Sequence, residues 1–208
     1  MMDRRRFFKI SGLASIAGAG LLSGCSDKSA NAERQMTYRT HQGNGDRISL
    51  LGYGCMRWPA SKDADGREVV DQEMVNKLVD YALESGINYF DAAPMYHNGD
   101  CERVTGIALS RHPRDKYFIA TKLSNFKDHS REAAMQMYRK SFEDLQTDYI
   151  DYYLLHSVKD AETFRQRYVD NGMIDFLLEE RKAGRIRNLG FSFHGKKTGF
   201  NELMALHE

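Results

Sequence analysis

Four side chains that can hold or move a proton lie at or just after the ends of hydrophobic runs. Asp91, Lys122 and His156 each close such a run, and Tyr96 follows Asp91 by five positions. The runs span residues 87–91, 117–122 and 149–156. They are short, rich in aromatic or β-branched residues and followed by polar turn residues, which predicts buried strands. A phenol, an ammonium, a carboxylate and an imidazole at successive strand ends form a set suited to proton transfer.

Each of these residues also has a structural interpretation. Asp91 is compatible with a helix-capping or loop aspartate, and Tyr96 with a tyrosine of a surface loop. The aliphatic stem of Lys122 can lie along apolar surface with its ammonium in water, and His156 is compatible with a hydrogen-bonded structural histidine. Their joint occurrence, in this order and at successive strand ends, favours a catalytic site.

The body of the chain alternates predicted strands with predicted helices. A hairpin is expected from residues 36–40 and 47–51, which flank a Gly-Asn-Gly turn. Barrel strands are expected to end near residues 54, 91, 122, 156 and 191. Helices are expected over residues 71–85, 101–110, 130–145, 173–183 and 198–207. Strict alternation with short loops predicts parallel strands joined by right-handed crossovers, an α/β fold of the (β/α)8 TIM-barrel type.

The predicted barrel is incomplete. About five barrel strands are expected, whereas closure requires eight strands and roughly 250 residues. The 208-residue chain ends inside a predicted helix. We therefore expect a truncated barrel over residues 36–208, either a gene fragment or a partial product.

The first 35 residues predict a targeting segment that is not part of the folded domain. Arg4 to Lys9 resembles a twin-arginine export signal, and the apolar stretch that follows is too short and too diluted by Gly and Ala to span a membrane. The sequence Leu22-Ser23-Gly24-Cys25 resembles a lipobox, so residues 1–25 predict an export signal with a lipid on Cys25. Residues 26–35 predict a polar tether. The expected partners are the export machinery and a membrane, on the periplasmic side; an amphipathic tail of a cytoplasmic protein is the alternative.

Charge and cysteine spacing argue against nucleic-acid binding and against a metal site. The formal charge of +1 and the absence of a basic block beyond the N-terminus give no support for nucleic-acid binding. A hydrophobic content of 41% is enough for a sizeable core. Cys25, Cys55 and Cys101 lack the close spacing of a metal or redox motif, so no metal site is expected. Cys55 and Cys101 are expected to be isolated thiols, with a disulfide between them as the alternative.

Five segments together resemble the aldo/keto reductase family, from Met36 to the C-terminus. These segments are Gly52–Arg57, Asn88–Tyr96, Thr121–Lys122, Asp148–His156 and Gly184–Ser192. The resemblance implies a (β/α)8 barrel that binds NADP(H) or NAD(H) in extended form and acts on a small carbonyl substrate. The Phe-Ser-Phe-His-Gly sequence at 191–195 resembles a bacterial subgroup whose longer members carry a C-terminal iron–sulfur region.

The resemblance also implies a role for each residue of the set. Tyr96 would be the general acid that protonates the carbonyl oxygen. A phenol is a poor acid at neutral pH, and a neighbouring Lys122 ammonium would favour the phenolate and so ease proton release. Asp91 would hold the lysine in place, and His156 would hydrogen-bond the carbonyl oxygen and orient the substrate.

The cofactor residues implied by the resemblance are Met56, Arg57, Asp91 and Ser192. Ser192 matches the serine that holds the nicotinamide carboxamide. The residue after it departs from the family, because Phe193 replaces a frequent asparagine and cannot donate a hydrogen bond. Trp58, after the first barrel strand, is expected to line the substrate pocket or to serve in packing.

Two functions therefore compete. One is an NAD(P)H-dependent oxidoreductase that reduces a carbonyl to an alcohol, with Tyr96 as the acid; the intact set of four residues favours it. The other is a truncated, catalytically silent barrel fragment that acts as a lipid-anchored binding module or has no function. The missing later strands favour this alternative.

Overall fold

A five-stranded parallel sheet forms the centre of the computed structural model, which describes residues 36–206. Its strands lie side by side in chain order: β3 (Tyr53–Gly54), β6 (Tyr89–Asp91), β7 (Phe118–Leu123), β8 (Ile150–Val158) and β9 (Ile186–Phe193). Because right-handed crossovers between strands in unreversed order put every connecting helix on the same face, this topology is that of a barrel and not of a doubly wound sheet. Within the described residues the sheet is open, with β3 and β9 at its edges.

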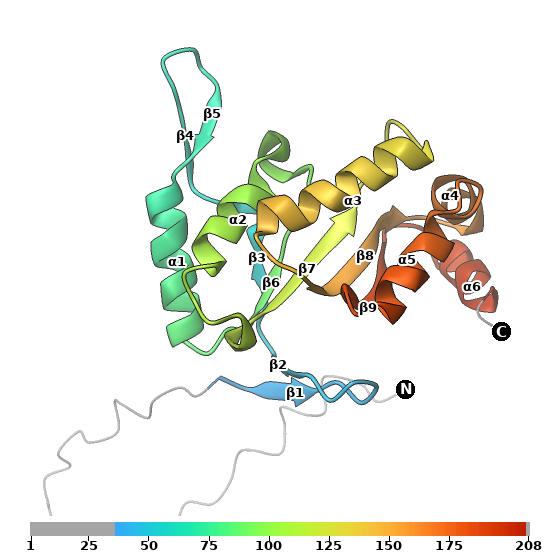
Figure 1. Cartoon of the computed structure of the whole chain (residues 1–208), viewed down its shortest axis with the longest axis horizontal. Coiled ribbons are helices and arrows are strands. Elements are labelled where there is room, and N and C mark those ends of the chain that lie inside the picture. Colours follow the sequence, from blue (N-terminus) through green and yellow to red (C-terminus); the bar gives the residue numbers. More distant parts are fainter. Residues whose placement is uncertain (1–35, 207–208) are drawn as a thin grey trace, which may run out of the picture. The chain divides into compact units, whose positions relative to one another are not determined.

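The connecting helices pack against one another along the outer face of this sheet (Figure 1). They are α1 (Gln72–Glu84), α2 (Cys101–Leu109), α3 (Arg131–Leu145), α4 (Ala161–Phe164), α5 (Met173–Lys182) and α6 (Lys197–Ala205). Two predicted N-caps are confirmed: Asp71 accepts a hydrogen bond from the backbone of Met74, and Ser130 from that of Ala133. None of the helices in residues 36–206 has the length and apolar composition needed to cross a bilayer.

Two antiparallel hairpins flank the sheet. The predicted one is confirmed as β1 (Tyr38–Thr40) and β2 (Arg47–Ser49). The second, β4 (Ala60–Lys62) and β5 (Glu68–Val70), was not predicted. Its turn carries an Asp65-Gly66 pair, in which Gly66 adopts a positive φ of 77°. The strands are only three residues long, so their alternation gave little signal, whereas the turn chemistry was readable.

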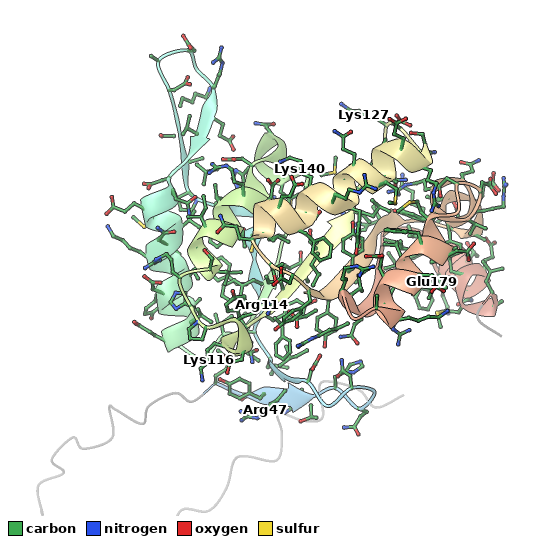
Figure 2. The ribbon with its side chains drawn as sticks, in the orientation of Figure 1. Arg47, Arg114, Lys116, Lys127, Lys140 and Glu179 are labelled. Carbon is green, nitrogen blue, oxygen red and sulfur yellow. The ribbon has the colours of Figure 1, made fainter. Side chains whose placement is uncertain are left out.

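The two ends of the sheet differ in character. At the N-terminal end of β8, buried Asp151 accepts hydrogen bonds from Arg114 and Arg187, and both guanidinium groups lie 4.0 Å from the centre of the Tyr149 ring. Figure 2 shows Arg114 toward the β1–β2 hairpin and Lys127, in the loop before α3, at the other end. Structural ion pairs therefore occupy the end of the sheet near the β1–β2 hairpin. The opposite end, where the strands finish near Lys127, is the place to look for a functional site.

Helices α2 and α3 approach each other closely at Gly106. A Cβ atom on this residue would lie 2.2 Å from the carbonyl oxygen of Asp144 and 2.7 Å from the Cα of Leu145. Backbone atoms cannot move aside as a flexible side chain can, so the contact requires glycine. This close approach lets α2 carry buried side chains up to β7.

Replacing Gly106 by alanine is therefore expected to lower the free energy of unfolding by about 1–3 kcal/mol or more. Urea unfolding of the full chain measures the change. Gly54→Ala is the matched control, because no atom of residues 36–206 lies within 4 Å of the added methyl group. Equal stability of the two variants would contradict the packing described for α2 and α3.

Candidate active site

The strand register brings the predicted residues to one edge of the sheet. Gly54 lies beside Asp91, Asp91 beside Ala120, and Lys122 beside Leu154. Since parallel strands end on the same side, the segments after β3, β6, β7, β8 and β9 all meet at this edge. The four residues predicted to act together are therefore brought together by the fold.

Lys122 is the most constrained of the four. It is only 4% exposed, and its ammonium donates to Asp91 Oδ1 at 2.5 Å and to the carbonyl oxygen of Ala92 at 2.7 Å. A buried ammonium needs such partners, because the cost of removing a charge from water is large. The contacts exclude the alternative in which Lys122 extends into solvent at the rim.

Tyr96 lies in the turn Tyr96–Gly99 that follows β6, half-buried at the same edge. The Lys122 ammonium lies 5.1 Å from the centre of its ring, and the ring of His156 meets it edge-on at 5.8 Å between ring centres. Lys122 thus approaches the face of the phenol, while its hydrogen bonds go to Asp91 and Ala92. The ammonium of Lys122 and the imidazole of His156 therefore both lie next to the phenol ring of Tyr96.

The turn after Tyr96 is strained. His97 and Asn98 both have left-handed backbone angles, with φ of 50° and 54°. Such angles in non-glycine residues cost free energy and concentrate at functional sites. His97 Nε2 accepts a hydrogen bond from the backbone of Trp58 at 2.7 Å, so its proton is on Nδ1, which donates to Glu68 Oε1 at 2.8 Å. The unpredicted β4–β5 hairpin therefore anchors the turn that carries Tyr96.

His156 is held as a neutral imidazole. Its Nδ1 lies 2.6 Å from the hydroxyl of Ser124, and the ring is 5.0 Å from that of Phe126. Burial, followed by the positive charges of Lys122, Arg167 and His194, lowers the pKa of His156 to about 4. When the Ser124 hydroxyl donates to Nδ1, the imidazole proton is on Nε2 and can be donated to a ligand.

Three of the residues predicted to bind cofactor or substrate follow β3. Met56 and Arg57 are exposed and line an open hollow of about 500 Å³ together with Tyr96 and His97. Trp58 borders the same hollow but is only 3% exposed, and its indole N–H donates to Thr105 at 2.9 Å. Packing is the main role that the structure gives Trp58, and its contact with substrate stays a prediction.

Ser192 lies on β9, next to the end of β8. Its hydroxyl oxygen accepts the backbone N–H of Ser157 at 2.8 Å, and Ser157 has a left-handed φ of 55°. Ser192 is thereby placed beside the residue that follows His156. Phe193, the departure from the family pattern, packs edge-on against Phe200 of α6 at 5.4 Å between ring centres.

The two cysteines near the site are free thiols in the described structure. Cys55 and Cys101 are fully buried, and Cys101 Sγ lies 3.4 Å from the carbonyl oxygen of Cys55. Burial raises the pKa of the Cys101 thiol to about 11. Of the two possibilities left open by the sequence, the isolated thiols are confirmed. Cys25, the predicted lipidation site, lies outside the described residues.

A buried carboxyl group links the three elements that pack next to Lys122. Glu102 of α2 is fully buried and accepts hydrogen bonds from Thr121 of β7 at 2.5 Å and from Ser141 of α3 at 3.1 Å. Burial raises its pKa to about 7. Sequence reasoning did not single out Glu102, because a glutamate in an amphipathic helix is usually exposed.

A parallel sheet in chain order, with tyrosine, lysine, aspartate and histidine at its strand ends, has the arrangement of a protein of the TIM-barrel type. The chain belongs to the aldo/keto reductase family: the model of that family matches residues 50–198. This assignment agrees with the resemblance seen in the sequence motifs.

Curated relatives match over part of their length. An uncharacterized oxidoreductase, YqkF, of Bacillus subtilis is 33% identical over 154 residues, which cover 70% of this chain and 45% of that protein. Probable aldo-keto reductase 1 of Glycine max is 30% identical over 71% of this chain and 42% of its own length. The chain spans about half the length of the curated relatives it matches.

Solved structures agree with this placement. An aldo-keto reductase from Klebsiella pneumoniae in complex with NADPH is 26% identical, with a TM-score of 0.59 over 82% of this chain and 54% of that one. An aldo-keto reductase from Bacillus halodurans, in its holo form, is 29% identical with a TM-score of 0.59, over 76% of this chain and 51% of that one. The open five-stranded sheet thus corresponds to part of their folds.

The burial of Glu102 predicts a pH dependence of stability. Its folded-state pKa of about 7 lies above the ordinary value of 4.5, so its favourable contribution is complete below pH 4.5 and is lost as pH rises to about 7. Glu102→Gln should remove this loss, which amounts to up to about 3 kcal/mol. The quantity to compare is the unfolding free energy at pH 5 and pH 8, variant against parent.

Glu84→Gln, on the exposed surface of α1, is the matched control and should leave the difference between the two pH values unchanged. If Glu102→Gln and Glu84→Gln behave alike, Glu102 is not a buried, titrating group in the folded protein.

Proposed function

We propose that this protein is an NAD(P)H-dependent oxidoreductase that reduces a small carbonyl compound to an alcohol, with Tyr96 as the general acid. The observation that carries the proposal is the convergence of Tyr96, His156 and the Lys122–Asp91 pair at one edge of the sheet. Membership of the aldo/keto reductase family and the NADPH bound to the Klebsiella pneumoniae relative support it.

Each residue has a physical task in this reaction. The Tyr96 hydroxyl gives its proton to the carbonyl oxygen as negative charge builds there. The fixed positive charge of Lys122 stabilises the phenolate that remains, and Asp91 accepts a hydrogen bond from that buried ammonium and balances its charge. His156, neutral at pH 7, donates from Nε2 to the same oxygen and so selects the orientation of the substrate.

The residues at the edge fit the nicotinamide part of the cofactor, which supplies the hydride when bound. A serine hydroxyl that accepts the Ser157 N–H still has its own proton to donate, so Ser192 can hold a carboxamide oxygen. Met56, Arg57 and Asp91 would border the same place. The choice between NADP(H) and NAD(H) is made by the residues that hold the adenosine end of the cofactor.

We also propose that the protein is exported by the twin-arginine machinery and anchored on the periplasmic side of the membrane through Cys25. The support is the order of motifs in residues 1–25, an arginine cluster, an apolar stretch and a lipobox-like end. A reductase at this place would retain its cofactor or receive electrons from a partner.

Tyr96→Phe tests the acid directly. It should lower kcat for carbonyl reduction by about 10²-fold or more and leave the Kd for NADPH unchanged, because the ring remains and only the hydroxyl group is lost. NADPH binding is followed by nicotinamide fluorescence in the full chain. Tyr81→Phe, on an exposed position of α1, is the control. Turnover retained in Tyr96→Phe removes Tyr96 from the mechanism, and the absence of saturable NADPH binding would favour the catalytically silent alternative.

Cys25→Ala tests the anchor. The parent protein should fractionate with membranes of a bacterial host, and the variant should appear in the soluble periplasmic fraction, because its lipid attachment atom is absent. Cys55→Ala is the control, since Cys55 is buried in the core and should not change the fractionation. Membrane association that is the same in both variants would rule out a lipid on Cys25.

A further inference from the structure

A buried arginine lies next to His156, and the described part of the chain gives it no acidic partner. Arg167 is 4% exposed and belongs to the π-helical turn Arg165–Val169. Among residues 36–206, its hydrogen-bond partners are neutral: the carbonyl oxygen of His156 at 2.8 Å and the side-chain oxygen of Asn125 at 3.2–3.3 Å. Buried charges are usually paired, so this arrangement calls for a reason.

The turn that carries Arg167 is itself unusual. π-helical turns are rare, and they occur frequently at functional sites. This one places two consecutive side chains, Arg167 and Tyr168, near the end of β8. The hydroxyl of Tyr168 donates to the carbonyl oxygens of Leu123 and His156. Arg167 and Tyr168 together tie the ends of β7 and β8 to one element.

Aromatic rings extend the contact from Arg167 to the imidazole. The guanidinium lies 4.5 Å from the centre of the Phe126 ring, and that ring lies 5.0 Å from the ring of His156. Arg167 is therefore linked to His156 in two ways, directly by a hydrogen bond to its backbone and indirectly through the tilted ring of Phe126 to its side chain. The same guanidinium fixes Asn125, which precedes Phe126.

We propose that Arg167 is a positioning residue for the site: it anchors the backbone of His156, supports Phe126 against the imidazole, and sets a positive charge beside that imidazole. The proposal deepens the reductase function and rests on it only where turnover is concerned. A neutral imidazole is the form that can donate from Nε2 while Nδ1 accepts from Ser124.

Several charged or titratable groups face His156, and the proposal concerns one of them. Lys122 approaches from β7, His194 from the segment after β9, and Tyr96 from the turn after β6. Lys122 is paired with Asp91, which offsets part of its charge. Because Arg167 has neutral partners, its charge acts on His156 without an adjacent carboxylate to offset it.

The test follows the ring of His156 by NMR in the full chain, labelled with ¹⁵N and ¹³C at histidine. Arg167→Met should raise the pKa of His156 by about 0.5–1 unit, and Arg167→Lys, which keeps the charge, should leave it near the parent value. Arg165→Met is the matched control, because Arg165 lies on the same turn but is exposed and paired with Glu162 and Asp170. An unchanged titration in a folded Arg167→Met, or an equal shift in Arg165→Met, overturns the proposal.

A second readout decides the case if Arg167→Met does not fold. Arg167→Lys loses the planar fork that holds both His156 and Asn125. The nuclear Overhauser contact between the rings of Phe126 and His156 should therefore weaken by at least half; full retention of this contact contradicts the positioning role. Neither NMR readout requires turnover, so a protein without reductase activity would refute the proposed function while leaving this inference to stand or fall separately.

Discussion

The burial of the Lys122 ammonium is the interaction on which the site depends. An ammonium with 4% exposure is tolerable only because Asp91 and the carbonyl oxygen of Ala92 are fixed within hydrogen-bonding distance. Both partners come from the end of β6, so the pair requires β6 and β7 to end together. The strand register meets this requirement, and Tyr96 follows on the same turn. The strand order that brings β6 and β7 side by side is therefore also what places Asp91, Lys122 and Tyr96 together.

Contacts from several elements hold the surroundings of this ion pair in place. Glu102 joins α2, β7 and α3 one position before Lys122, and Gly106 lets α2 come close enough to do so. On the other side, burial and then the positive charges of Lys122, Arg167 and His194 lower the pKa of His156, and the Ser124 hydroxyl lies within hydrogen-bonding distance of its Nδ1. A histidine that remained protonated there would repel Lys122 and could not accept from Ser124 at Nδ1. The fold therefore specifies protonation states as well as positions.

The sequence predicted the strands of the central sheet, the capped helices and the four central residues because each leaves a local signal. Asp91, Lys122 and His156 end recognisable strands, and Asp71 and Ser130 begin recognisable helices. The supporting residues could not be predicted, since their roles arise from contacts between distant segments. His97 is defined by Trp58 and Glu68, and Arg167 by the ends of two strands. The β4–β5 hairpin was missed because its three-residue strands show little alternation and its readable Asp65-Gly66 turn was not used, whereas the equally short β1–β2 hairpin was predicted from its Gly-Asn-Gly turn.

The central claim is that Tyr96 and Lys122 act as one proton-delivering unit. A double-mutant cycle on kcat/KM for carbonyl reduction measures this most directly, with Tyr96→Phe, Lys122→Met and the combined variant. If the lysine serves only to stabilise the phenolate of Tyr96, removing both groups should cost no more than removing one, because neither works without the other. Losses that multiply in the combined variant would show two independent roles and contradict the account.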